Sequence, residues 1–381
     1  MSKIFFNEPY IAGEELSNLI DLFDRNQFYG NGFYTRSCQK LIGSILGEGS
    51  VLLTDSCTSA LEMTALLLRD WNAKQEVIVP SYTFSSTASA YARAGFEIVF
   101  AEVDPKTMMI DIADAERKIT SNTVAIIGVH YGGSAFEVHE ARKVCDKYQI
   151  LLIEDAAQAF GCSLNDKSLG LFGDFSCFSF HETKNLHCGL GGALVINDPS
   201  YLDRAMHIWE RGTNRQEVLK GLADKYSWVE IGGSFYPSEL QAAFLLAQLQ
   251  CFDSNIKERS AVYAGYYNAF VELNIDGIYF PVDKKGYVTN FHAFWVIFSS
   301  SLECDYVREH LAGEEIAAYI GYVPLHSSKV GLSMGNLAED LPLTEEYSKR
   351  ILRLPLHNKM LSSESEMIAY RIQGLVNEYR K

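Results

Sequence analysis

A lysine and an acid, each placed at the end of a predicted strand, are the residues best suited to chemistry. Lys184 follows the strand-like run Phe-Ser-Cys-Phe-Ser-Phe at residues 175–180, and Asp155 ends the apolar run Leu-Leu-Ile-Glu-Asp at residues 151–155. A lysine whose pKa is lowered by burial can form an imine with an aldehyde. A buried carboxylate is costly unless it is paired, and a protonated pyridine nitrogen would pair with it. The two residues therefore predict a cofactor that carries an aldehyde on a pyridine ring, as pyridoxal 5'-phosphate does.

Hydroxyl groups placed after strands would hold the phosphate of such a cofactor. The run Thr-Asp-Ser-Cys-Thr-Ser-Ala at residues 54–60 ends a predicted strand and opens a helix. Free N–H groups and the helix dipole favour an anion at that point. Thr58 and Ser59 would add their hydroxyls there, and Ser179 would reach the phosphate from the end of its own strand. Taken alone, Thr58 and Ser59 are more readily explained as an ordinary helix N-cap.

Two further side chains would contact the ring itself. Phe84 lies just past the predicted strand at residues 76–80 and would stack on a flat heterocycle. Gln158 lies three residues after Asp155 and would donate a hydrogen bond to the phenolic oxygen of the ring. Taken alone, Phe84 is better explained by core packing, and Asp155 is explained equally well as the cap of a following helix. What makes the pattern specific is the order of these groups along the chain.

The elements that would position these residues alternate along the first part of the chain. Apolar strand-like runs are separated by helix-like runs, which predicts βα units and a mostly parallel sheet. The predicted strands lie at residues 51–54, 76–80, 97–103, 123–129, 151–155, 175–180 and 192–196. The predicted helices between them lie at residues 59–71, 86–94, 112–118 and 137–148. Ligands of such sheets bind at the carboxyl ends of the strands, where the polar groups fall.

The pattern changes after residue 238. One long helix is predicted at residues 238–273, followed by a strand at residues 294–298 and two helices at residues 344–353 and 363–379. We therefore expect an α/β fold with two domains. Residues 1–245 would form the large domain with the mostly parallel sheet, and residues 246–381 a smaller C-terminal α+β domain.

Composition and charge exclude several classes of protein. Of the 381 residues, 48% are hydrophobic, which suffices for one large core and a smaller one. The formal net charge of −15 argues against nucleic acid and anionic membrane surfaces as partners. No apolar run approaches the length of a membrane-spanning helix. The eight cysteines are scattered without a C-x-x-C pair, so we expect reduced thiols, no metal site and a cytoplasmic protein.

Several stretches resemble the DegT/StrS-type sugar aminotransferases, and the resemblance extends over residues 31–357. The shared stretches are Leu-Thr-Asp-Ser-Cys-Thr (53–58), Pro-Ser-Tyr-Thr-Phe (80–84), Val-His-Tyr (129–131), Phe-Ser-Phe-His-Glu-Thr-Lys-Asn (178–185), Gly-Thr-Asn (212–214), Asp-Lys-Tyr (224–226) and Pro-Leu-His (324–326). The resemblance implies fold type I of the pyridoxal-phosphate enzymes, the fold of aspartate aminotransferase. It also implies that Lys184 and Asp155 are catalytic and that Thr58, Ser59, Phe84, Gln158 and Ser179 bind the cofactor.

The resemblance further implies the reaction and the partners. An amino group would pass from L-glutamate to a nucleotide-linked keto sugar, with pyridoxamine 5'-phosphate as the intermediate form of the cofactor. The stretches are most similar to those of members that convert dTDP-4-keto-6-deoxy-D-glucose to dTDP-4-amino-4,6-dideoxy-D-galactose. Members are homodimers with shared active sites, and Ser234 would replace the asparagine with which many members reach the partner's phosphate. The loop at residues 187–192 is shorter than in most members, which leaves the choice of sugar open.

Alternatives remain for the reaction and for the nucleotide site. A transaminase for a 3-keto or differently configured nucleotide sugar fits the same residues, and a non-catalytic regulator that binds the cofactor is a further possibility. The absence of G-x-G-x-x-G after the early strands excludes an ordinary dinucleotide-dependent dehydrogenase. The loop at residues 29–33, Tyr226 and His326 are candidates for nucleotide contact, but they are equally well explained as turn residues and core aromatics.

Overall fold

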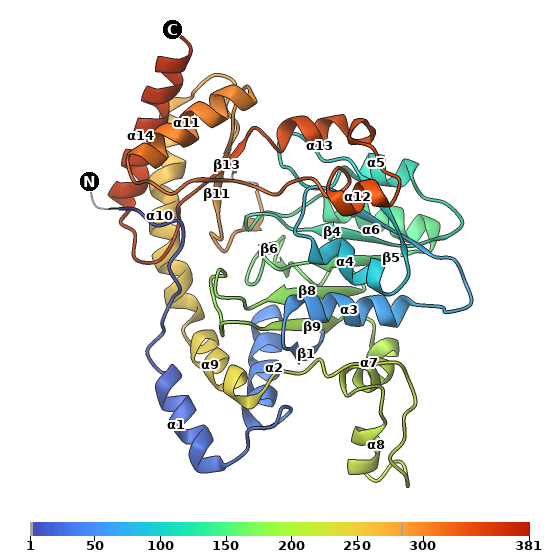
Figure 1. Cartoon of the computed structure of the whole chain (residues 1–381). Helices are drawn as coiled ribbons and strands as arrows, with labels where there is room; N and C mark the ends of the chain where they lie inside the picture. The colour runs from blue at the N-terminus through green and yellow to red at the C-terminus, as the bar shows by residue number, and fades with distance from the viewer. Residues whose placement is uncertain (1–2, 283–284) are drawn as a thin grey trace.

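A seven-stranded sheet forms the centre of the computed structural model, which describes residues 3–282 and 285–381 (Figure 1). The strand order is β1-β9-β8-β5-β4-β2-β3. The strands are β1 (Ser50–Thr54), β2 (Glu76–Pro80), β3 (Glu97–Ala101), β4 (Thr123–Val129), β5 (Leu151–Asp155), β8 (Phe175–Ser179) and β9 (Gly192–Ile196). In this sheet only β9 runs antiparallel to its neighbours, β8 and β1. The predicted, mostly parallel sheet is therefore confirmed, and so is the α/β class.

Helices cover both faces of this sheet, because its strands are apolar on both sides. In β2, for example, Val77 and Val79 belong to one buried cluster and Ile78 to another. This alternation follows from the two-residue period of a strand. The covering helices are α2 (Phe33–Leu46), α5 (Ile112–Arg117), α6 (Val138–Tyr148) and α9 (Glu239–Gln250) on one face, and α3 (Cys57–Leu68), α4 (Ser86–Arg93) and α7 (Leu202–Trp209) on the other.

The C-terminal part of the chain builds a third buried cluster beside the sheet. The long helix α10 (Phe252–Leu273) packs along α14 (Ser362–Tyr379), as Figure 1 shows. A three-stranded antiparallel sheet of order β11-β13-β12 lies with them. Its strands and the neighbouring helix are β11 (Phe294–Ile297), β12 (Tyr319–Ile320), β13 (Ile351–Leu354) and α11 (Ser301–Gly313). Ile4 at the other end of the chain is buried in the same cluster.

Shorter elements complete the structure. The remaining helices are α1 (Glu15–Arg25), α8 (Arg215–Leu219), α12 (Lys329–Ser333) and α13 (Pro342–Tyr347), with 3-10 turns η1 (Pro199–Tyr201) and η2 (Ala338–Asp340). A small sheet of order β10-β6-β7 is formed by β6 (Ser163–Leu164), β7 (Lys167–Ser168) and β10 (Tyr287–Val288). Among the described residues, no helix combines the length and the apolar character needed to cross a membrane. All eight cysteines, each within the described ranges, are free thiols.

Two predicted helices are wrong in part. The single helix expected at residues 238–273 is divided at Cys251 into α9 and α10, because α9 packs against α1 and α2 whereas α10 packs against α14. The helix expected at residues 344–353 ends early, and its last part is the strand β13. A short apolar run fits either structure, and here pairing with β11 and β12 decides for the strand.

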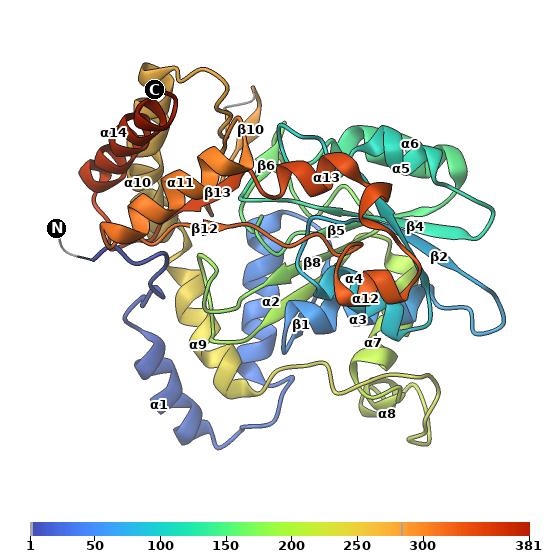
Figure 2. The same ribbon diagram turned by 45° about the horizontal axis from the view of Figure 1, so that its top comes forward.

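The segment between β12 and β13 returns to the large sheet and covers its edge (Figure 2). Leu325 donates its N–H to the carbonyl of Ser81 at 2.9 Å, and Thr344 donates its N–H to the Glu102 carboxylate at 2.6 Å. We propose that the chain forms two domains. The boundary expected after residue 245 lies inside α9, and the change of packing partners favours a boundary at Cys251.

A buried carboxylate on β5 ties the sheet to the loop before β8. Glu154 accepts hydrogen bonds from the backbone N–H groups of Gly170 at 2.7 Å, Phe172 at 2.7 Å and Gly173 at 2.6 Å. His130 Nε2 lies 2.9 Å from the same carboxylate. Both side chains are fully buried, so removing the carboxylate would leave several buried donors without an acceptor.

We expect Glu154→Ala to lower the free energy of unfolding by about 3–5 kcal/mol, the usual cost of removing one partner from a buried ionic contact. Urea-induced unfolding of the purified protein measures the change. The matched control is Glu140→Ala, because Glu140 is an exposed acid of α6 paired with Lys143, and its loss should change stability by no more than about 0.5 kcal/mol. Equal unfolding of the two variants would contradict the role of Glu154.

Candidate active site

A cavity of about 560 Å³ lies where the carboxyl ends of β5 and β8 meet the first turns of α3 and α4. Six of the residues singled out from the sequence line it: Thr58, Phe84, Asp155, Gln158, Ser179 and Lys184. They come from four separate stretches of the chain. The parallel sheet brings them together because the carboxyl ends of its strands share one edge.

Asp155 is positioned by the pairing of β5 with β8. It lies opposite Cys177 in the sheet register, and Cys177 belongs to the buried cluster on the side of α3 and α4. Thr87 of α4 donates its hydroxyl to Asp155 Oδ2 at 2.8 Å, and the N–H of Ala157 donates to Oδ1 at 3.2 Å. Burial, with only 4% of the residue exposed, raises the pKa of Asp155, and these hydrogen bonds and the charge of Lys184 oppose the shift.

Lys184 follows β8 in a turn that its backbone closes by donating to the carbonyl of His181 at 2.8 Å. The side chain is partly buried and lines the cavity. Burial lowers the pKa of Lys184, while the nearby Cys57 and Asp155 act in the opposite direction. The amine is therefore neutral at lower pH than that of a free lysine, and a neutral amine is the form that attacks an aldehyde.

The first turns of α3 and α4 meet at one part of the cavity wall. Thr58 Oγ1 lies 2.8 Å from the hydroxyl of Ser86, at the start of α4, and both residues line the cavity with Ser56 and Ser179. Ser59 is not part of this lining. Its N–H donates to the Ser56 hydroxyl at 3.0 Å, and the same hydroxyl donates to Ser59 Oγ at 3.0 Å. Hydroxyls and free N–H groups at two helix N-termini make this region suited to a phosphate.

Gln158 and Phe84 both lie close to Tyr322. The side-chain oxygen of Gln158 accepts from the N–H of Gly132 at 2.7 Å, and its nitrogen donates to the Tyr322 hydroxyl at 2.9 Å. The second N–H of the amide stays available for an acceptor in the cavity. Phe84 is 59% exposed, and its ring centroid lies 6.3 Å from that of Tyr322, so a flat ring in the cavity can stack on it.

These residues fit pyridoxal 5'-phosphate. The cavity has the volume of an ordinary cofactor pocket. Asp155 is a desolvated carboxylate that a pyridinium nitrogen would pair with, and Lys184 is an amine made more neutral by burial. The wall at Thr58, Ser86 and Ser179 supplies hydroxyls for the phosphate. One cavity thus offers groups that suit the ring and the aldehyde of the cofactor and groups that suit its phosphate.

Besides Ser59, four residues considered from the sequence lie outside the cavity of this chain. Ser234 is exposed, forms an isolated bridge with Glu210 and does not line the cavity. Tyr29 and Tyr226 are exposed as well. All three remain available to ligands or partners at the surface of the protein.

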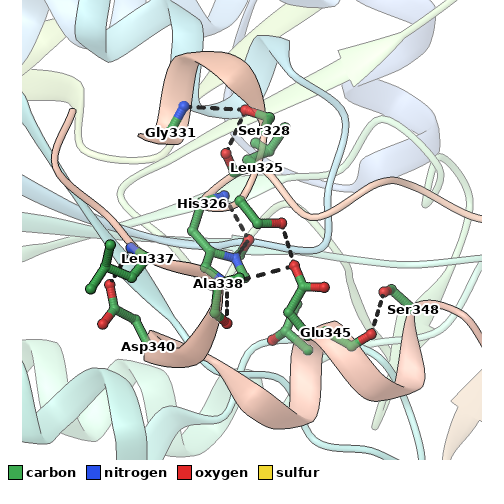
Figure 3. Close-up of polar contacts among 12 residues, drawn as sticks. Leu325, His326, Ser328, Gly331, Leu337, Ala338, Asp340, Glu345 and Ser348 are labelled. Atoms are coloured by element: carbon green, nitrogen blue, oxygen red, sulfur yellow. Dashed lines mark hydrogen bonds and ion pairs between the residues drawn. The ribbon is translucent and has the colours of Figure 1, made fainter. Parts of the chain in front are cut away.

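The fourth, His326, is fully buried and belongs to the core. Its Nδ1 lies 2.7 Å from the Ser81 hydroxyl, its Nε2 3.3 Å from the carbonyl of Ala338, and Glu345 approaches Nε2 to 3.9 Å. Figure 3 shows His326 among the residues of the segment that carries α12 and α13. The interpretation as a core residue is therefore favoured over a nucleotide contact.

Several polar residues of the cavity were not found from the sequence, and Ser86 of the phosphate wall is one of them. Thr87 lies one turn beyond Phe84, and this helical spacing is the only local signal for it. His292, Tyr322 and Arg353 also line the cavity. They come from the C-terminal part of the chain, where no spacing relates them to Lys184, so only the folded chain brings them to the site.

Comparison with known proteins places this geometry among aminotransferases. Residues 9–373 match the DegT/DnrJ/EryC1/StrS aminotransferase family. The chain is 29% identical over 384 residues to dTDP-4-dehydro-2,3,6-trideoxy-D-glucose 4-aminotransferase of Saccharopolyspora spinosa, with 99% of this chain and 97% of the relative covered. It is 28% identical over 378 residues to GDP-perosamine synthase of Vibrio cholerae, with 97% of this chain and 98% of the relative covered.

The fold agrees with that of solved sugar aminotransferases. The PLP form of a putative sugar aminotransferase from Streptococcus pneumoniae superimposes with a TM-score of 0.89 over 99% of each chain, at 21% sequence identity. At this identity the likeness concerns the fold, which is the one expected from the sequence.

We expect Thr87→Val to raise the dissociation constant of pyridoxal 5'-phosphate by roughly tenfold or more, since a hydrogen bond to a charged group contributes about 1.5–3 kcal/mol. Without the hydroxyl, the pKa of Asp155 rises further, so at a given pH less of the carboxylate remains to hold a proton on the ring nitrogen. Absorbance titration of the apoprotein measures binding. Thr87→Ser, which keeps the donor, should bind as the wild type does. Equal affinity of the valine variant would contradict this role.

Proposed function

The chain belongs to the DegT/DnrJ/EryC1/StrS aminotransferase family, and from this premise we propose that it transfers the amino group of L-glutamate to carbon 4 of a dTDP-linked 4-keto sugar. It is a pyridoxal-phosphate-dependent sugar aminotransferase. The observation that carries the proposal is the convergence of Lys184 and Asp155 on one cavity from the ends of neighbouring strands. Pyridoxal 5'-phosphate, when bound, supplies an aldehyde and an electron-accepting ring.

We assign a separate role in the proposed reaction to each group of residues around the cavity. We assign to Asp155 the task of holding a proton on the ring nitrogen, for which its buried position and the Thr87 hydrogen bond suit it. Lys184 Nζ takes the proton from the α-carbon of the amino donor and delivers a proton to carbon 4 of the sugar. Phe84 and Gln158 orient the ring, and Thr58 and Ser179 hold the phosphate.

The proposed sugar substrate is dTDP-4-keto-6-deoxy-D-glucose, and the product dTDP-4-amino-4,6-dideoxy-D-galactose. The relative from Saccharopolyspora spinosa is a 4-aminotransferase for a dTDP sugar, and it supports both the nucleotide and the reacting carbon. The relative from Vibrio cholerae is named for a GDP sugar, so membership of the family leaves the nucleotide variable. The sequence resembles dTDP-4-amino-4,6-dideoxygalactose transaminase in its motifs, which favours the dTDP sugar.

A panel of nucleotide-linked keto sugars with L-glutamate as donor tests this function. We expect dTDP-4-keto-6-deoxy-D-glucose to give an amine on carbon 4 by NMR, with release of 2-oxoglutarate. Lys184→Ala should lower turnover by roughly 10²–10⁴-fold or more, the usual contribution of a positioned acid–base group. Lys143→Ala, which changes an exposed lysine of α6, is the matched control and should be fully active.

Each other outcome of the panel has a definite meaning. An amine on carbon 3 of a 3-keto sugar would identify the alternative transaminase. A cofactor-loaded protein that releases no 2-oxoglutarate with any sugar of the panel would contradict the enzymatic function and favour a cofactor-binding regulator.

We also propose that the protein is a homodimer in which each site is completed by the neighbouring chain. Large apolar side chains are exposed around α8, which projects from the rest of the protein in Figures 1 and 2. Leu222 and Trp228 are each 76% exposed, and Leu219, Tyr226 and Val229 are exposed beside them in sequence. Apolar surface of this kind marks an interaction site, and a second copy would also bring a Ser234 toward a cavity.

We expect Leu222→Glu to convert the dimer to a monomer, because a charge buried in an apolar interface would be unpaired. Light scattering coupled to size-exclusion chromatography measures the mass. Leu302→Glu is the control, since Leu302 is 68% exposed on α11 and outside the α8 region. A wild-type protein that is monomeric at micromolar concentration would contradict the proposal.

A further inference from the structure

His292 has one ring nitrogen without a partner in the protein. The residue lies just before β11 and lines the cavity together with Lys184. Its Nδ1 lies 2.9 Å from Asn185 Oδ1. Within residues 3–282 and 285–381, no group hydrogen-bonds to Nε2, and this atom keeps some exposure, unlike the buried ring nitrogens of His357. Nε2 is therefore accessible to a ligand in the cavity.

The hydrogen bonds of Asn185 decide which ring nitrogen of His292 carries the proton. Asn185 Nδ2 donates to the carbonyl of Asn290 at 2.6 Å, so the atom that faces the imidazole is the acceptor Oδ1. His292 Nδ1 must then be the N–H donor. In the neutral ring Nε2 consequently carries a lone pair and can only accept a hydrogen bond.

The backbone of His292 is held on both sides. Its N–H donates to Asn290 Oδ1 at 3.0 Å, and its carbonyl accepts from Arg259 Nη2 at 2.7 Å. Asn290 Nδ2 in turn donates to the carbonyls of Gln158 and Phe160, each at 3.0 Å, so the orientation of this amide is fixed as well. A side chain supported in this way is preorganised for a ligand.

The ring of His292 stays neutral in these surroundings. Burial lowers the pKa of His292 well below its usual value, and the charges of Lys184, Arg259 and Arg353 act in the same direction. Carboxylates, phosphates and keto groups offer only acceptors, so they do not match a lone pair on Nε2. The matching ligand group is a donor, either a hydroxyl or an amine.

His292 also lies close to the amine that transfers the proton. His292 and Lys184 both line a second cavity of about 10 Å³, the size of one water molecule, as well as the larger one. Two residues that share the wall of so small a space are near neighbours. A ligand group bound at Nε2 therefore lies near the carbon that exchanges a proton with Lys184.

We propose that His292 Nε2 accepts a hydrogen bond from the hydroxyl on carbon 3 of the keto sugar. The inference rests on the proposed function, because it concerns the second substrate of that reaction. The amine of the amino donor is the group that is transferred, so the hydroxyls of the sugar are the donors that remain. In dTDP-4-keto-6-deoxy-D-glucose these hydroxyls are on carbons 2 and 3, and only carbon 3 is bonded to carbon 4. His292 thus selects sugars that keep the hydroxyl on carbon 3 over 3-deoxy sugars.

Two unreactive sugars test the inference by isothermal titration calorimetry with the cofactor-loaded enzyme. The probes dTDP-6-deoxy-D-glucose and dTDP-3,6-dideoxy-D-glucose have no keto group, and they differ only in the hydroxyl on carbon 3. We expect the wild type to bind the first about three- to tenfold more tightly, the usual contribution of one hydrogen bond between uncharged groups. Equal dissociation constants would overturn the inference.

Two substitutions separate the hydrogen bond at Nε2 from the support given by Asn185. His292→Asn keeps a donor for Asn185 near the position of Nδ1 and removes the acceptor at Nε2, so it should bind both sugars equally. His292→Gln loses the contact with Asn185 but can place an amide oxygen near the position of Nε2, so it should keep the preference. A preference retained by the asparagine variant would assign His292 a structural role and overturn the inference. If these variants do not fold, as judged by circular dichroism, the comparison of the two sugars on the wild type decides.

His310→Asn is the matched control, because His310 is an exposed histidine of α11 outside the cavity. It should bind both sugars as the wild type does.

The two proposals fail in different measurements. Neither probe can receive an amino group, so the dissociation constants do not depend on amino transfer. A failure of the proposed function is seen in the panel of keto sugars, whereas a failure of the role of His292 is seen in equal binding of the two unreactive sugars.

Discussion

Desolvation of two opposite charges at the ends of neighbouring strands is the constraint on which the site depends. Burial raises the pKa of Asp155 and lowers that of Lys184, so it moves each group toward its neutral form. Their mutual attraction and the Thr87 hydrogen bond act against this change. A ligand that offers a ring cation to the acid and an aldehyde to the amine suits both groups at once.

The sheet and its helices supply hydrogen bonds that lower the energetic cost of burying charged groups at the site. Asp155 and Glu154 are neighbours on β5, and their side chains point to opposite faces of the sheet. Glu154 is satisfied by three backbone N–H groups and His130, so its charge stabilises the loop before β8. Asp155 receives fewer hydrogen bonds. The difference leaves one carboxylate structural and the other available to a ligand.

The C-terminal part of the chain completes the cavity from the opposite side. Tyr322 connects the segment that crosses the sheet edge with Gln158, and Arg353 places a positive charge near Lys184 from the small sheet. Glu102 and Ser81 hold that segment through Thr344 and Leu325. The acid and the amine therefore belong to the large sheet, while the groups that would select a substrate also come from the smaller one.

Local sequence determined the elements of the large sheet and the residues that follow its strands. Apolar runs of five to seven residues indicated β2, β4 and β5. Polar groups at the end of β5 and after β8 singled out Asp155 and Lys184, because an apolar run and the polar residues that follow it are local features of the sequence. Tertiary structure decided the rest. Whether residues 351–354 form a helix or a strand depended on pairing with β11. The approach of Arg353 and Tyr322 to Lys184 depended on contacts between segments more than a hundred residues apart in sequence. No spacing in the sequence encodes such contacts.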